Sequence, residues 1–178
     1  MLELENIRKQ LDEFRKNVIT KAKANLRKKN SSGKLSDSLD SELQVSKNSF
    51  RLAFMMEDYA QFVDKGVKGA DPSRVKNGKQ KAPNSEFSFK RKNFAVRPSA
   101  LDKWIINKGI APRKINGRFA SRKTLKYLIA RSIHAQGIKP SLFFTKPFQS
   151  EFKGLSDDLI KAFGLDVDEF LKYTLNKK

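Results

Sequence analysis

The stretch LELENIRKQLDEFRKNVITKAKANLRKK, residues 2–29, decides the first half of the fold. Its apolar residues recur at alternating spacings of three and four, which puts them on one stripe of a helix: Leu4, Ile7, Leu11, Phe14, Val18 and Ala22. Acidic residues lie in its first half and Lys and Arg in its last turns, as the helix dipole favours. The stretch predicts one long helix that ends at residues 30–33, Asn-Ser-Ser-Gly, and packs on its own domain. A coiled-coil seam is the alternative interpretation, because three to four heptads are present.

The next residues predict a small antiparallel sheet. Residues 35–39 fit either a turn of helix or the entry to a strand, and residues 41–48 and 49–57 then alternate around a turn near 46–49. Tyr59, Phe62 and Val63 lie on one face of a short predicted helix that stops at Gly66.

The second half of the chain is mainly helical by pattern. Residues 98–109 predict a helix with Leu101, Trp104 and Ile105 on its face. Another helix is expected from the capping residue Ser121 to Gly137, with Leu125, Leu128, Ile129 and Ile133 on one side. An extended run over 138–144 follows, and then two helices over 147–163 and 167–175 that break at Gly164.

These elements predict an α+β fold. We expect a long N-terminal helix packed on a small antiparallel β-sheet, with further helices in the C-terminal half. The chain is treated as a single domain, 1–178, with a C-terminal helical segment over 145–178.

Composition narrows the protein class. The 178 residues include 14 Phe, enough to build a core, and no Cys, which fits a reducing compartment. The first residues carry charges throughout and lack the apolar core of a signal peptide, and no apolar run is long enough to cross a membrane. We therefore expect a soluble protein made in the cytoplasm that makes no membrane contact.

The formal net charge of +19 is concentrated in the middle of the chain. Residues 65–131 hold 19 Lys and Arg against three acidic residues, 19 − 3 = 16, whereas residues 151–169 hold six acidic residues against two Lys. Residues 67–97 read as a long basic loop or arm inserted into the domain. The candidates for contact with a polyanion or an acidic partner are Arg74, Lys76, Lys79, Lys81, Lys90, Arg91, Lys92, Arg97, Arg113, Lys114 and Arg118.

Within this region, Phe87, Phe89 and Phe94 alternate with cations. Such aromatics stack nucleic-acid bases in some proteins, but the same pattern also fits a strand that docks its Phe side on a neighbour.

The sequence offers no specific catalytic site. His134 is the only histidine and has no cysteine or clustered acid near it in sequence, so we expect a packing or surface residue. Three- or four-ligand Cys/His zinc sites are excluded by composition, and neither a phosphate-binding loop nor a nucleophile elbow occurs. A carboxylate magnesium site stays open, with these candidates: Asp157, Asp158, Asp166, Asp168 and Glu169. Solvated helix faces explain their spacing better, and Asp166 is placed to cap the last helix. We expect a protein with no catalytic residues, metal or cofactor; a nuclease is a rival interpretation.

Three segments in order, residues 32–39, 58–66 and 137–148, together resemble those of a known family, the tail-completion and neck proteins of long-tailed bacteriophages. Residues 32–39, SGKLSDSL, resemble the segment that follows the first helix in that family. Residues 58–66, DYAQFVDKG, and residues 137–148, GIKPSLFFTKPF, resemble its Tyr-Ala segment and its later Pro-aromatic segment. The resemblance implies assembly or interface roles for Tyr59, Phe62, Val63, Gly66, Pro140, Phe143, Phe144, Pro147 and Phe148.

The resemblance also implies a function. It predicts a structural virion protein, a subunit of a homo-oligomeric neck or tail-completion ring at the head–tail interface, which contacts neighbouring portal, adaptor or tail proteins. The basic region would then meet an acidic protein surface, which we favour, or packaged DNA without sequence preference. The alternative is a free nucleic-acid-binding protein, a packaging or regulatory factor that uses the basic middle region.

Overall fold

Helices and two short antiparallel strand pairs make up the part of the chain that the computed structural model describes: residues 4–27, 33–46, 49–74, 78–90, 96–110 and 121–175. The α+β class and the long N-terminal helix are confirmed. Although the sequence predicts one domain, contacts divide the chain into two compact units. Unit 1 is Met1–Asp58 with Phe143–Lys178, and unit 2 is Tyr59–Leu142.

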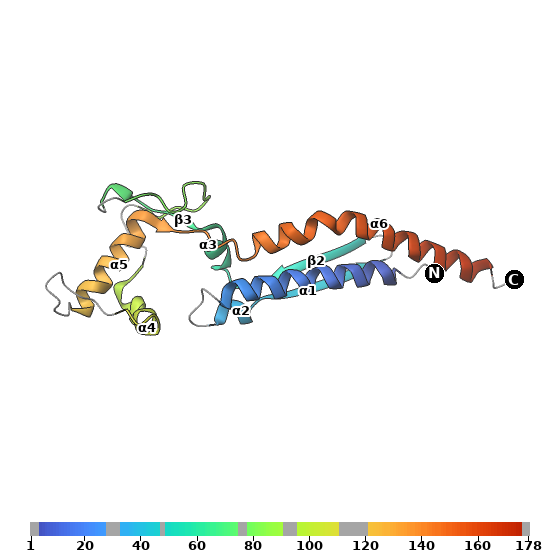
Figure 1. Ribbon diagram of the computed structural model, residues 1–178, viewed down its shortest axis with the longest axis horizontal. Helices are drawn as coiled ribbons and strands as arrows, with labels where there is room; N and C mark the ends of the chain where they lie inside the picture. The colour runs from blue at the N-terminus through green and yellow to red at the C-terminus, as the bar shows by residue number, and fades with distance from the viewer. Residues whose placement is uncertain are drawn as a thin grey trace. The chain divides into compact units, whose positions relative to one another are not determined.

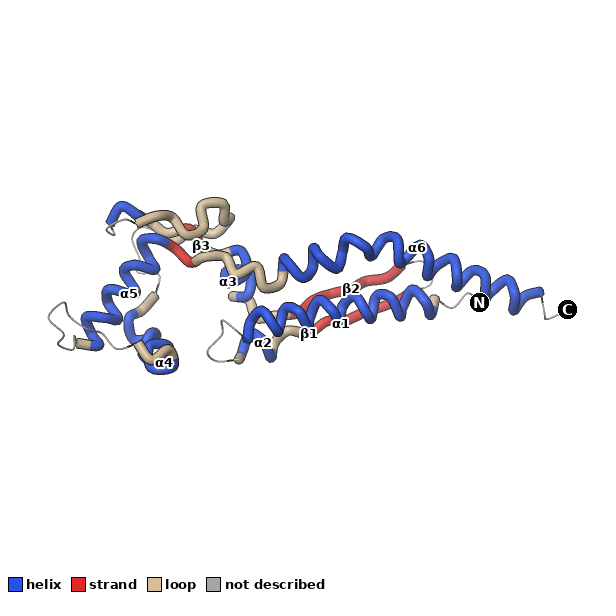
Figure 2. Tube along the Cα trace, viewed as in Figure 1, coloured by secondary structure: helices blue, strands red, loops and turns tan. Residues whose placement is uncertain are grey.

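In unit 1, helix α1 (Glu5–Arg27) lies alongside helix α6 (Thr145–Leu175) and a β-hairpin (Figures 1 and 2). The stripe predicted from sequence faces inward, since Leu11, Val18 and Ala22 are buried in α1. Ile7 and Leu11 pack with Ala162 of α6, and Leu43, Leu155 and Leu159 close around them. α1 therefore packs within its own unit, as the sequence predicts.

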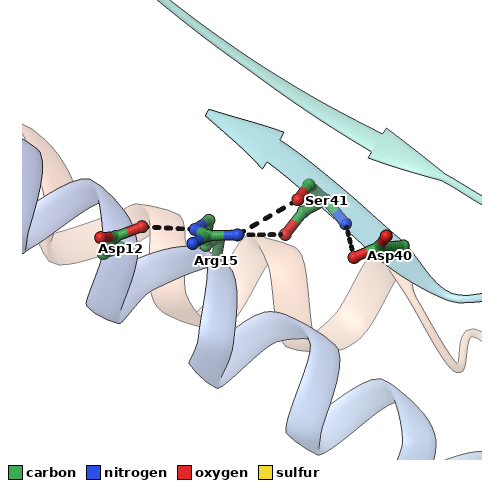
Figure 3. Close-up of polar contacts among 4 residues, drawn as sticks. All are labelled: Asp12, Arg15, Asp40 and Ser41. Carbon is green, nitrogen blue, oxygen red and sulfur yellow. Dashed lines mark hydrogen bonds and ion pairs between the residues drawn. The ribbon is translucent and has the colours of Figure 1, made fainter. Parts of the chain in front are cut away.

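The hairpin consists of β1 (Asp40–Ser46) and β2 (Ser49–Met55), with Asp40 opposite Met55 and Ser46 opposite Ser49. The predicted strand pair is confirmed, although β2 ends two residues early. Before it, α2 (Lys34–Asp37) forms the turn of helix that was one of two interpretations. Arg15 ties α1 to β1: its guanidinium donates to the Ser41 carbonyl at 3.1 Å and to the Asp12 carboxylate at 2.5 Å (Figure 3).

Aromatic rings fill the space between the hairpin and the two helices. The Phe54 ring meets Phe14, Phe144 and Phe148 edge-on, with ring centroids 6.4, 5.2 and 6.0 Å apart. Edge-to-face packing at these distances is favourable beyond the burial of apolar area. Much of the Phe content therefore serves as the core of unit 1.

Helix α6 corrects the predicted break at Gly164, because it continues through this residue to Leu175. A helical glycine costs only about 1 kcal/mol relative to alanine, and contacts on both sides offset that cost. Ala162 packs on α1, and the buried Asp166 accepts hydrogen bonds from the backbone N–H groups of Asn6 and Ile7 at 2.9 and 3.2 Å. Asp166 therefore holds the start of α1; its predicted role as a cap of a separate last helix is wrong.

Unit 2 is built around α5 (Arg122–Gln136), which packs on a 3-10 turn, η2 (Pro98–Leu101), and on α4 (Asp102–Asn107). The Ser121 hydroxyl accepts from the Lys123 N–H at 3.2 Å, which confirms the predicted cap. Leu101, Ile105 and Ala130 form the buried centre. Leu128, expected on the inner face of α5, is exposed.

The described parts of 67–90 have little regular structure and are anchored to the rest of unit 2. β3 (Val67–Lys68) pairs with β4 (Gly137–Ile138), and Lys68 also bridges to Ser88. Farther along, the N–H of Lys81 donates to the Gln136 carbonyl at 2.9 Å. A second turn of 3-10 helix, η1 (Pro72–Arg74), also lies in this segment.

Candidate assembly surfaces

Two of the three family-like segments meet at one junction in unit 2. Helix α3 (Ala60–Lys65) ends beside residues 138–142, where the Val63 carbonyl accepts from the Ser141 N–H at 3.1 Å and from its hydroxyl at 2.7 Å. The Leu142 N–H donates to the Asp64 carbonyl at 3.0 Å. Sequence reasoning gave these segments one role without predicting that they touch.

Gly66 makes the junction possible. Its φ of 73° is one that L side chains rarely adopt, and a Cβ there would lie 2.6 Å from the Ile138 carbonyl oxygen and 2.7 Å from the Pro140 nitrogen. The Gly66 carbonyl accepts from the buried Ser85 hydroxyl at 2.7 Å. Gly66 is buried and supports the fold, and its role in assembly stays a prediction.

Residues that were predicted to share one face of the short helix α3 are partly exposed. Ala60 and Asp64 are buried, whereas Tyr59 and Phe62 are largely exposed. The Phe62 ring meets Phe87 edge-on at 4.5 Å. Tyr59 and Phe62 therefore remain accessible to a partner.

The later aromatic residues belong to unit 1 and mostly serve its core. Phe143 is completely buried and its carbonyl accepts from the Asn25 side chain, and Pro147 is buried too. Both are enclosed in unit 1, and their role at an interface stays a prediction. Phe144 and Phe148 are half-buried in the aromatic cluster around Phe54.

Five of the eleven basic candidates lie on described residues, and all five are exposed: Arg74, Lys79, Lys81, Lys90 and Arg97. Arg74 is bound to Asp71 at 3.2 Å, and its carbonyl accepts from Arg131. The pKa of Asp71 is lowered, chiefly because the Ser73 hydroxyl donates to its carboxylate, with Arg74 adding to the effect against a desolvation cost. The other six candidates lie outside the described residues: Lys76, Arg91, Lys92, Arg113, Lys114 and Arg118.

The aromatics of this segment are occupied by the fold. Phe87 packs on Phe62, and the Phe89 ring stacks on the imidazole of the buried His134, with centroids 6.1 Å apart and planes 21° apart. This geometry favours the docked-strand interpretation over base stacking, and it confirms His134 as a packing residue. Phe94 lies outside the described residues.

A long accessible apolar surface was missed by sequence reasoning. It lies on α6, where eight large apolar side chains are exposed: Phe152, Ile160, Phe163, Leu165, Phe170, Leu171, Tyr173 and Leu175. The available signal was the width of the apolar arc, which exceeds the single stripe that α1 covers. Splitting the helix at Gly164 hid this continuity.

An apolar groove of about 560 Å³ opens on unit 2. Five residues without charge and two lysines line it: Leu101, Trp104, Ile133, Gly137, Ile138, Lys81 and Lys139. Its size is that of pockets which hold drug-sized ligands or a few large side chains.

The described residues do not assemble a metal centre. No group of three or more metal-binding side chains occurs among them, and the candidate acids of α6 are dispersed along its length. Every buried side-chain nitrogen and oxygen in this part of the chain has a hydrogen-bond partner. Within the same residues, no helix combines the length and apolarity that a membrane span requires.

No family model, curated protein or solved structure matches the chain. The resemblance to phage tail-completion proteins therefore stays a prediction.

Proposed function

We propose that this protein is a structural subunit of a virion, a member of a neck or tail-completion ring at the head–tail interface, and that it works without catalysis. The observation that carries the proposal is the apolar surface of α6. Eight large apolar side chains are exposed along this one helix, and exposed apolar groups gathered on one element mark interaction sites. The family-like segments indicate which kind of assembly this is, since their residues resemble those of head–tail joining proteins.

The junction at Gly66 supports the same proposal. The two segments that resemble this family lie far apart in sequence, yet they are joined through Val63 and Ser141. Because the two segments build this junction together, we expect both to occur in the same chain. The aromatic side chains Tyr59 and Phe62 beside it are accessible for contact with a neighbouring ring.

A loss-of-function experiment tests the proposal. A tailed phage that encodes this chain, with a stop codon placed early in the gene, should accumulate filled heads and separate tails. Electron microscopy of the lysate reveals both, and supplying the chain in trans should restore joined particles. Normal joined particles without the chain would contradict the proposed function.

A free nucleic-acid-binding role is the second candidate, and the charge of unit 2 favours it. Residues 59–142 carry 20 Lys and Arg against four acidic residues, 20 − 4 = 16 of the +19 net charge. Cations on an accessible surface release counterions from DNA without reading its sequence. This candidate predicts tight duplex binding by the monomer, whereas the ring subunit needs none.

A further inference from the structure

Two accessible apolar surfaces, one in each unit, differ in the charges around them. The first is the α6 face, which we define as Ile160, Phe163, Val167, Phe170, Leu171 and Leu175. The second is the groove of unit 2, lined by Leu101, Trp104, Ile133, Gly137 and Ile138. What covers each surface follows from its shape and its charge.

The α6 face has the spacing of a helix that docks in a groove. Residues 160, 163, 167 and 170 follow one another at spacings of three or four, and residue 171 lies four positions after 167, so they share one side of the helix. α1 begins where Asp166 binds Asn6 and Ile7, so the last nine residues of α6, roughly 14 Å, extend past it (Figure 1). Exposed fractions of 69% at Ile160 and 72% at Leu175 mark this face as open.

The C-terminal half of α6 is mainly acidic. Residues 157–175 hold five acidic residues against Lys161 and Lys172, and Asp157, Asp158, Asp168 and Glu169 are exposed. Both lysines lie near acids, since Lys172 binds Asp168 at 2.8 Å and Lys161 lies 4.0 Å from Asp158. By helical spacing Asp157 lies at the edge of the α6 face, whereas Asp158 and Glu169 lie on the side of Leu165. A partner for this face should therefore be apolar and basic.

The groove has the complementary character. Mainly apolar residues line it together with Lys81 and Lys139, and the surrounding unit carries a net charge of +16. Its volume of about 560 Å³ accommodates side chains from one face of a helix. An occupant should therefore be apolar and acidic, which describes α6 and its neighbouring carboxylates.

We propose that the α6 face of one copy of this chain docks in the groove of unit 2 of a second copy. The proposal rests on the proposed ring function and names its subunit contact. Because the two surfaces differ, a docked pair still has one free α6 face and one free groove. Further copies add through the same contact until the assembly closes into a ring. Pairing of two α6 faces would instead bring like charges together, which complementary interfaces avoid.

Trp104 allows a direct measurement, because it is the only tryptophan and it lines the groove. The purified full chain is diluted over a wide concentration range while Trp emission and sedimentation mass are recorded. We expect emission to move to shorter wavelengths as the mass rises, since docking removes Trp104 from water. A chain that stays monomeric over that range, or that assembles with unchanged emission, would overturn the proposal.

Two variants on α6 provide the matched comparison. Phe170→Lys places a cation on the α6 face opposite a basic groove, and it should weaken assembly by about tenfold or more. Leu165→Lys makes the same change at an exposed position on the other side of α6, and assembly should stay within about twofold, as expected of a position outside the contact. Equal effects of the two substitutions would contradict docking through this face.

Mixing distinguishes unlike surfaces from self-pairing. A groove variant, Lys81→Glu with Lys139→Glu, should assemble poorly alone, as should Phe170→Lys. Mixed together, the two variants should form pairs and no larger species, because only one intact α6 face can meet one intact groove. Normal assembly of the groove variant would overturn the proposal. These measurements need only the purified chain, and their failure would count against the contact between copies. Absence of the chain from virions would instead count against the proposed function, so the two failures are distinguishable.

Discussion

At the scale of single residues, Asp166 does the most to join distant parts of the chain. Its carboxylate is only 2% exposed and accepts two backbone hydrogen bonds and one side-chain hydrogen bond at the start of α1, 160 residues away in sequence from Asn6. The first N–H groups of a helix have no partner within the helix, and the positive end of its dipole favours an anion there. One side chain thus accepts hydrogen bonds from the first N–H groups of α1 and fixes the register of α1 against α6.

Asp166→Ala should lower the free energy of unfolding by about 1–3 kcal/mol, because it leaves buried N–H groups unpaired. Asp166→Asn should cost less, since its amide oxygen still accepts. Urea denaturation followed by circular dichroism measures both. The control is the exposed Asp157→Ala, which should stay within about 0.5 kcal/mol of the parent. A loss for Asp166→Ala no larger than for this control would contradict the capping role.

Gly66 offers a second residue-scale test. Gly66→Ala combines a positive φ with a backbone clash, and we expect it to destabilise the chain by more than the 1–3 kcal/mol or so typical of strained positions. Gly109→Ala has a similar φ of 60° but no atom within 4 Å of the new Cβ, so it should cost only the strain. Thermal unfolding of both variants measures the difference. If the two were equally stable, the close approach of Gly66 to Pro140 would be unimportant.

At the scale of elements, sequence reasoning succeeded where a regular pattern faces one neighbour. The stripe of α1, the strand pair and the Ser121 cap were each predicted and are each present. The pattern failed where tertiary contacts outweigh local preference. Gly164 should end a helix by propensity, yet neighbours at Ala162 and Asp166 hold it in one.

The anchoring of 67–90 lay beyond sequence reasoning for another reason. It depends on backbone groups, such as the Lys81 N–H that donates to Gln136, and on the Gln80 side chain, which pairs with both backbone groups of Gly69. Such contacts leave no periodic trace in the sequence. The candidate site could be predicted only in part for a similar reason. The family-like segments were recognised from their residue types, which do not reveal that Tyr59 and Phe62 are exposed and that Phe143 is buried.

The continuity of α6 yields a prediction at this scale. Gly164→Ala should raise the free energy of unfolding by about 0.5–1 kcal/mol, because alanine loses less conformational freedom in a helix interior and nothing lies within 4 Å of its Cβ. Urea denaturation of the variant beside the parent chain measures the change. Destabilisation would indicate that the helix needs a break at this residue.

At the scale of the whole molecule, charge and apolar surface are divided between the two units. Unit 2 carries +16 and unit 1 the remaining +3, whereas the longest exposed apolar face belongs to α6 of unit 1. The proposed contact between copies uses this division, because it brings the basic groove of one copy to the acidic second half of α6 of another.

The charge can be tested with DNA directly. The full chain should bind duplex DNA without sequence preference, with a Kd of about 10⁻⁴–10⁻⁶ M at physiological salt. Replacing Lys79, Lys81, Lys90 and Arg97 with Gln should weaken this binding and reduce its salt slope by up to about 0.9 for each phosphate that the protein no longer neutralises. Fluorescence anisotropy across a salt series measures both quantities. Nanomolar binding by the monomer at physiological salt would favour the regulatory or packaging factor instead.

The central claim is that the chain is a built-in part of a virion, and quantitative mass spectrometry of purified particles tests it most directly. Particles are banded twice by density, and the chain is counted against the other proteins of the head–tail joint. The account predicts a small, fixed copy number that survives high-salt washing. Absence of the chain from purified particles, while it is abundant in the lysate, would contradict the account.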